Sequence, residues 1–146
     1  KEAMKDYNKA IEQDKYNAVA FMQRGHLKLK LGKTEDALLD FDESIRLNPW
    51  LKGAHLGKSN VYAMRGNIEG EMQELGEAIS LDGSDPSPFL KRGRLLAQTG
   101  KHRRAISDLI HAQDLFLGQG KREQAAELAP VIGELQRTEA QSSKQD

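Results

Sequence analysis

Apolar side chains recur along the chain at helical spacing, in segments that are separated by short polar turns. One such segment spans residues 18–31, and a second, over residues 34–47, has apolar side chains at i, i+1, i+4 and i+8, starting from Ala37. This spacing puts the apolar side chains on one side of a helix. Gly32, between the segments, can adopt the left-handed conformation that ends a helix. The pattern therefore predicts two helices joined by a tight turn.

The same pattern returns every 34 residues, and small residues mark the period. Glycine recurs at Gly32, Gly66 and Gly100. Two further series of small residues keep the same step: Gly25, Ser59 and Gly93, and Ala10, Ser44, Ala78 and Ala112. A period of this length is typical of a repeat array, in which each helical pair stacks on its neighbours.

The period divides the chain into segments. We predict the second helix of a truncated repeat over 1–17, repeats over 18–51, 52–85 and 86–119, a capping helix over 120–139 and a disordered tail over 140–146. The capping helix has an apolar stripe formed by Ala125, Leu128, Ile132 and Leu135. Pro130 lies within this stripe, and we expect it to kink the helix or split it in two.

The small residues are expected where the two helices of a pair come close together. We expect Gly25 to lie against Ala37, and Gly93 against Ala105, with bulky residues filling the space inside each pair. These bulky residues are Tyr7, Phe41, Leu75 and Leu109. Glu71 occupies the position of Ala37 in the following repeat, where a carboxylate has to be solvated or paired.

Residues 18–51 resemble a tetratricopeptide repeat, because bulky, small and turn-forming residues stand at that family's positions. The matching residues are Phe21, Gly25, Ala37, Phe41, Ser44 and Pro49. The resemblance covers about residues 1–117 and implies an all-α fold, a right-handed α-α superhelix with a C-terminal capping helix. It also implies that the first helix of each pair lines a concave groove that binds a peptide or a helix.

We obtain candidate partner-binding residues by mapping the groove positions of the family onto this sequence. They are Met22, His26, Lys30, Leu56, Asn60, Met64, Leu90, Lys91, Arg94 and Gln98. An apolar series beside side-chain hydrogen-bond donors suits an extended peptide. The alternative is that the apolar members, Met22, Leu56 and Leu90, only pack between repeats. Some members of the family clamp a C-terminal carboxylate, but only Lys91 fits that clamp here, which disfavours this ligand.

Composition narrows the range of functions. Lys plus Arg equals Asp plus Glu, at 22 each, so the whole molecule should not be attracted to nucleic acid or anionic lipid. The chain has no cysteine, which excludes disulfides and cysteine-bound zinc. It has no apolar run as long as a membrane span and no signal-peptide core, which favours an intracellular, cytoplasmic location.

Charge is unevenly distributed between repeats. Residues 52–85 hold three Lys or Arg against six Asp or Glu (net −3), and residues 86–119 hold six against two (net +4). The basic segment fits an acidic partner peptide. The alternative is that these charges form solvated faces and pair with one another.

Catalytic and metal-binding patterns are weak. The four histidines, His26, His55, His102 and His111, have no recognisable ligand spacing. Ser107, His111 and Asp114 could be nominated as a triad, but no nucleophile turn accompanies them. We therefore predict no enzyme activity, no cofactor and no metal.

The sequence predicts a protein–protein interaction scaffold without chemistry of its own. The alternative is a structural or oligomerisation segment of a larger repeat protein with an empty groove. Residues 1–17 match only a second helix, so their apolar side chains lack a first-helix partner. We therefore expect either that the chain is a fragment of a longer repeat protein or that self-association through residues 1–17 covers these side chains.

Overall fold

A computed structural model describes the whole chain, residues 1–146, and contains eight α-helices and no β-strand. The helices are α1 (Glu2–Gln13), α2 (Ala18–Lys30), α3 (Thr34–Leu47), α4 (Lys52–Met64), α5 (Ile68–Leu81), α6 (Pro86–Gln98), α7 (His102–Gly118) and α8 (Arg122–Gln145). The predicted all-α helical-repeat fold is therefore confirmed. The boundaries of α2 to α6 and the start of α7 follow the 34-residue period seen in the sequence, whereas α7 continues beyond it to Gly118.

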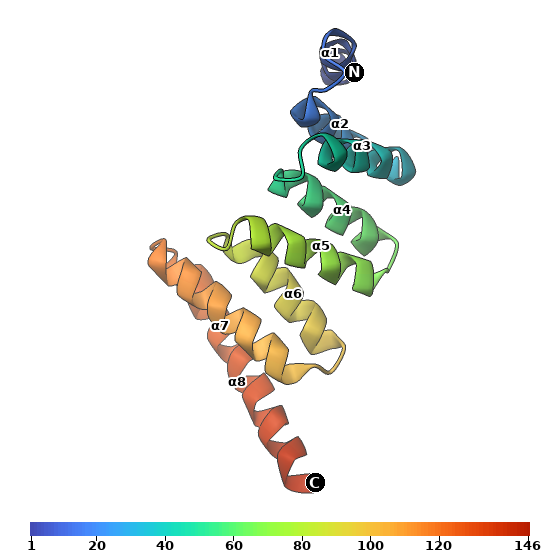
Figure 1. Cartoon of the computed structure of the whole chain (residues 1–146). Helices are drawn as coiled ribbons and strands as arrows, with labels where there is room; N and C mark the ends of the chain where they lie inside the picture. The colour runs from blue at the N-terminus through green and yellow to red at the C-terminus, as the bar shows by residue number, and fades with distance from the viewer. The chain divides into compact units, whose positions relative to one another are not determined.

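The helices, shown in Figure 1, form two compact units. The first unit, Lys1–Leu81, contains α1 to α5; α2 pairs with α3, α4 pairs with α5, and α3 packs on α4. Helix α1 packs on α2, and the first helices α2 and α4 also touch. The second unit, Asp82–Asp146, contains the α6–α7 pair and α8, which packs on α7.

Glycine with a positive φ ends each first helix. The φ angles of Gly32, Gly66 and Gly100 are 76°, 68° and 77°. Other residues pay a steric cost in this left-handed region because of their Cβ atom. These three positions therefore explain the strongest periodic signal in the sequence.

The close approach of paired helices differs in one respect from the prediction. A Cβ atom on Gly25 would lie 2.8 Å from the ring of Phe41, and one on Gly93 would lie 2.9 Å from Leu109. Each glycine thus faces the bulky residue of the second helix, one turn beyond the expected alanine. Ala37 and Ala105 are themselves fully buried. The glycines therefore make room for a large side chain of the second helix.

Phe41 and Glu71 show how two unusual positions of the first unit are accommodated. The ring of Phe41 is fully buried and lies between Gly25 of α2 and Gly57 of α4, where an added Cβ would be only 2.3 Å from the ring. Glu71 is half-buried, and α5 continues past it without interruption from Ile68 to Leu81. The carboxylate at the alanine position therefore does not break the helix.

Helix α8 is one continuous helix of 24 residues with Pro130 inside it, so the prediction that Pro130 splits it is wrong. The apolar stripe explains this continuity, because Ala125 and Leu128 before the proline and Ile132 after it are all buried. Packing on both sides of Pro130 compensates for the hydrogen bond that proline cannot donate.

The structure also differs from the predicted tail over residues 140–146, because α8 extends to Gln145. This segment has no glycine or proline, and alanine, glutamine and lysine are good helix formers. The hydroxyls of Ser142 and Ser143 donate to the carbonyls of Thr138 and Glu139, one turn earlier. Local helix propensity therefore extends the helix beyond its packed part.

Candidate partner-binding faces of the first helices

The predicted groove residues of the first unit come from α2 and α4. On α2, Met22, His26 and Lys30 follow one another at steps of four residues, so they share one side of the helix. Met22 reaches the start of α4: a Cβ atom on Gly53 would lie 2.7 Å from the Met22 Sδ atom. Met22 therefore fills the space that the missing side chain of Gly53 leaves between the two first helices.

His26 also contributes to the contact between α2 and α4. Its Nε2 atom lies 3.0 Å from the carbonyl oxygen of Gly53, and its ring meets Phe41 edge-on at 4.9 Å. Burial lowers the pKa of His26, which outweighs the opposite effect of the Gly53 carbonyl; the charge of Lys30 lowers it further. The neutral imidazole is therefore favoured, with Nε2–H donating to the carbonyl. Met22 and His26 join α2 to α4.

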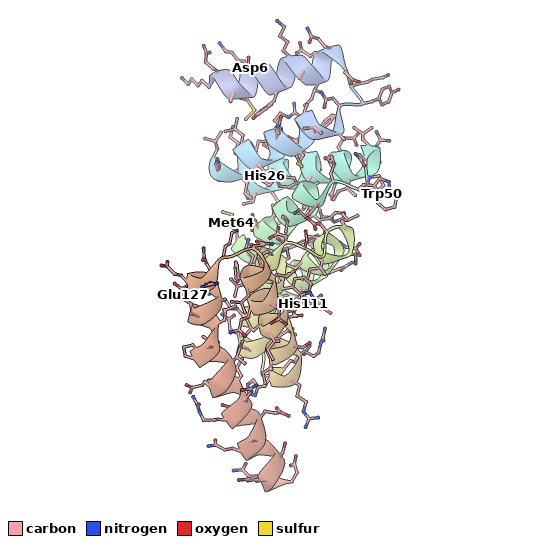
Figure 2. The ribbon with its side chains drawn as sticks, turned by 90° about the vertical axis from the view of Figure 1, so that its left-hand side faces the viewer. Asp6, His26, Trp50, Met64, His111 and Glu127 are labelled. Atoms are coloured by element: carbon pink, nitrogen blue, oxygen red, sulfur yellow. The ribbon has the colours of Figure 1, made fainter.

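The remaining predicted residues of this unit are more accessible. Leu56 and Asn60 are half-buried on α4, whereas Lys30 and Met64 are exposed at the ends of their helices. Met64 is 60% exposed (Figure 2). We call Lys30, Leu56, Asn60 and Met64 the α2–α4 face.

In the second unit, α6 presents the other four predicted residues. Leu90 is half-buried, and Lys91, Arg94 and Gln98 are exposed, without an ion pair or hydrogen bond to the rest of the chain. Residues 91, 94 and 98 lie on one side of the helix. We call Leu90, Lys91, Arg94 and Gln98 the α6 face.

Arg92 on the same helix is used quite differently. Its guanidinium makes two hydrogen bonds to the carboxylate of Asp108 on α7, at 2.7 and 2.9 Å. The hydrogen bond to Asp108 raises the pKa of Arg92, against the opposing effect of burial. Arg92 therefore stabilises the helix pair, while Arg94, two residues further on, is exposed and makes no ion pair or hydrogen bond within the chain.

Sequence reasoning missed that this ion pair is periodic. In α2–α3, Arg24 makes the same double hydrogen bond to Asp40, at 2.8 Å for each bond, and Lys28 lies 2.9 Å from the same carboxylate. In α4–α5, Lys58 lies 3.3 Å from Glu74. The signal was present in the sequence, because the three basic residues and the three acidic residues each recur at steps of 34.

The α4–α5 pair adds a histidine to this interaction. His55 Nδ1 lies 2.8 Å from Glu74, and both side chains are largely buried. Lys58 also binds Asp42 of α3, at 2.9 Å. Burial lowers the pKa of Lys58, but the hydrogen bond to Asp42 and the charges of both carboxylates outweigh burial and raise it.

The catalytic candidates are not assembled into a site. No hydrogen bond joins Ser107, His111 and Asp114; the ring of His111 instead stacks on Phe89 at a centroid distance of 4.2 Å. No group of three or more histidine or acidic side chains is arranged to hold a metal ion. None of the eight helices combines the length and the apolar character that crossing a membrane requires.

The family model described as a tetratricopeptide repeat matches residues 18–49, which hold α2 and α3. These residues form a tetratricopeptide repeat. The predicted resemblance to the tetratricopeptide-repeat family is thus confirmed by the family model, the helical repeat and the relatives described next.

Two curated relatives carry the same kind of repeat. The chain is 32% identical to the tetratricopeptide repeat and J domain-containing co-chaperone DNJ1 of Fusarium oxysporum f. sp. lycopersici, over 66% of this chain and 18% of that protein. It is 28% identical to tetratricopeptide repeat protein 36 of Xenopus tropicalis, over 60% of this chain and 46% of that protein. The chain thus spans less than half the length of these relatives.

A solved structure supports the fold. The type III secretion chaperone SycD of Yersinia enterocolitica, crystallised in complex with a peptide of the translocator YopD, aligns with 82% of this chain and 92% of that chain, with a TM-score of 0.72. The sequence identity is 18%, so this similarity concerns the fold alone.

Proposed function

We propose that this protein is a non-catalytic interaction scaffold, which binds a peptide or helix of a partner protein through its first helices. The observation that carries the proposal is the α6 face. Lys91, Arg94 and Gln98 are exposed on one side of α6 and make no bond within the chain, whereas Arg92 is fully used by Asp108. Unpaired donors beside the apolar Leu90 suit a peptide with carboxylates and a few apolar side chains.

The α2–α4 face supports the same function in the first unit. Met64 is an adaptable apolar side chain at the surface, and Asn60 can both donate to and accept from a peptide backbone. The related fold of SycD was crystallised with a bound peptide, which adds support by analogy. Met22 and His26 contribute by fixing α2 against α4.

A direct test selects peptides from a displayed library on the immobilised full chain and measures their affinity in solution. If the α6 face binds, Arg94→Ala should weaken a selected acidic peptide about tenfold, and raising the salt concentration should slow its association. Peptides that use the α2–α4 face should respond to Asn60→Ala.

Matched controls lie on second helices. Both control residues are exposed. Arg104 on α7 has the same guanidinium group as Arg94, and Gln73 on α5 has a side-chain amide like that of Asn60. Arg104→Ala and Gln73→Ala should leave the affinity unchanged. Selected peptides that bind all four variants equally well would show that the first helices are not the binding surface.

A structural or oligomerisation role is the second candidate, and the packing of Met22 and His26 against Gly53 favours it. In that case the first helices serve only to stack repeats. A library that yields no peptide with saturable binding would support this candidate and overturn the scaffold proposal.

A further inference from the structure

Two exposed aromatic side chains lie outside the candidate binding faces. Trp50 is 77% exposed, and Tyr16 is 65% exposed. Trp50 lies in the turn between α3 and α4, with the complete α2–α3 pair before it and the complete α4–α5 pair after it. Figure 2 shows Trp50 at the opposite end of α4 from Met64. A single exposed apolar side chain is normal in a protein, but these two share a position in the repeat.

The repeat presents both rings from the same kind of turn. Tyr16 and Trp50 are 34 residues apart, and each stands two residues before a first helix. Their backbone N–H groups donate to the side-chain oxygens of Asp14 and Asn48, each at 3.0 Å. A third turn with this hydrogen bond carries Ser84 in place of an aromatic residue. The aromatic residues are therefore a property of the first unit and not of the turn itself.

The two rings belong to one edge of the first unit, which we call the aromatic edge. Helices α2 and α4, which follow the two turns, are in contact, and helices in contact lie about 8–10 Å apart. Glu43 and, to a smaller extent, Tyr16 raise the pKa of Arg46, which stands four residues before Trp50. Tyr16 thus lies near the end of α3 that leads into Trp50. We expect the rings to be about one helix diameter apart.

Acids and bases alternate around the aromatic edge. Lys15 follows Asp14, and its Nζ atom lies 5.2 Å from the centroid of the Tyr16 ring. Arg46 makes two hydrogen bonds to Glu43, at 2.9 and 2.5 Å. These residues place no excess of one charge beside the rings, so they do not favour the phosphates of a lipid or a nucleic acid. An uncharged partner segment fits this edge better.

A polyproline II segment meets both conditions. It has three residues per turn and a rise of about 3.1 Å per residue, so prolines three positions apart are separated by about 9 Å. This separation matches the expected distance between the two rings. Such a segment is also extended before it binds, so it loses little conformational entropy on an aromatic surface. A partner helix would need a continuous apolar groove, which two rings on separate turns do not form.

We propose that the aromatic edge, Tyr16 and Trp50, binds a proline-rich segment of a partner protein in the polyproline II conformation. Prolines at positions i and i+3 of the segment pack on the two rings, one on each. This surface is separate from the α2–α4 face and the α6 face. The proposal does not rest on the function proposed for those faces.

Trp50 is the only tryptophan of the chain, so its fluorescence reports directly on this edge. The probe is an acetylated and amidated oligoproline of about ten residues, which forms a polyproline II helix, titrated into the full chain. We expect a saturable blue shift of the Trp50 emission, because the peptide displaces water from the indole. Tyr16→Ala should weaken the peptide about tenfold, whereas Tyr16→Phe should bind it normally, because the ring makes the contact.

Amide resonances of the isotopically labelled full chain test Trp50 itself, since Trp50→Ala removes the fluorophore. The wild type should show saturable shifts in the two aromatic turns and none at Ser84. Trp50→Ala should weaken the peptide about tenfold. Leu39→Ala is the matched control, because Leu39 is an apolar residue of α3 that is 68% exposed, and it should leave the affinity unchanged.

The proposal is overturned by an absence of saturable changes, by amide shifts confined to the other two faces, or by equal effects of Trp50→Ala and Leu39→Ala. Two further outcomes overturn it in favour of another occupant. A blue shift with phosphatidylcholine vesicles but not with oligoproline would indicate a membrane surface. A dimer of the chain that Trp50→Ala dissociates in sedimentation would indicate a second copy.

Discussion

The α6–α7 and α4–α5 pairs have the same repeat register but stabilise their helix contacts with different chemistry. In α6–α7, the planar guanidinium of Arg92 makes two hydrogen bonds to Asp108, and Phe89 stacks on His111. In α4–α5, Lys58 shares its charge between Glu74 and Asp42, and His55 replaces the aromatic residue and binds Glu74.

The helix pairs share residue types at four positions. Each pair keeps a base on the first helix, an acid on the second, a small residue after the base and a large apolar residue at position 41, 75 or 109. The geometry and number of hydrogen bonds are free to change. A guanidinium fixes a carboxylate from two directions, whereas an ammonium acts as a point charge.

The largest effect should come from the buried bulky residues. Phe41→Ala should lower the free energy of unfolding by about 3–5 kcal/mol, because a ring enclosed between Gly25 and Gly57 leaves a cavity that cannot collapse. Leu75→Ala should cost about 2–4 kcal/mol, since less volume is removed. Urea denaturation followed by circular dichroism measures both. A smaller loss for Phe41→Ala than for Leu75→Ala would contradict this account of the glycine contacts.

The next largest effect should come from the ion pairs, and its size should differ between the α6–α7 and α4–α5 pairs. Asp108→Asn should cost about 2 kcal/mol, because Arg92 loses the carboxylate charge and one of its two acceptor oxygens in a partly buried site. Glu74→Gln should cost about 1 kcal/mol, since Lys58 keeps Asp42 and the amide can still bond to His55. Hydrogen exchange in α6–α7 and in α4–α5 locates each effect. Equal costs would mean that bond number and geometry do not distinguish the two pairs.

The turn glycines should behave alike in both regions. Gly66→Ala and Gly100→Ala should each cost about 1 kcal/mol, because φ is 68° and 77° and nothing else crowds these positions. Gly118→Ala is the matched control: it lies in the last turn of α7 without a positive φ or a close neighbour, so it should be neutral or stabilising by about 0.5 kcal/mol. Thermal unfolding gives all three values.

The smallest effect should be a pH dependence of the stability of the first unit. Burial lowers the pKa of His26 below its usual value of 6.5, so the unfolded chain binds a proton more readily than the folded chain. Its contribution to stability should be complete above about pH 6.5 and should decline as the pH falls toward the lower, folded-state pKa.

The His26→Gln variant checks this contribution, because glutamine can donate to the Gly53 carbonyl but does not titrate in this range. The melting temperature of the wild type should fall more than that of the variant between pH 7.5 and pH 5. Parallel pH profiles would show that His26 does not titrate differently on unfolding. Arg94, at the corresponding position of the α6–α7 pair, does not titrate in this range.

The candidate site was only partly readable from the sequence. Helical register places Lys91, Arg94 and Gln98 on one side of α6, and the structure leaves them exposed. The same register treats Met22 and His26 as equivalent groove residues. It cannot show that Gly53, 31 residues after Met22, leaves a gap that Met22 fills and a carbonyl that His26 binds. Such contacts depend on the side chains of a neighbouring repeat.

By itself, the sequence determined the repeat, the all-α fold and the turns, because period, apolar spacing and turn glycine act over a few neighbouring residues. Only the tertiary structure decided which small residue faces which ring, which base pairs with which acid, and that α8 continues through Pro130. These outcomes depend on volumes and charges that meet between helices. Helix packing brings them together, and no local pattern contains that information.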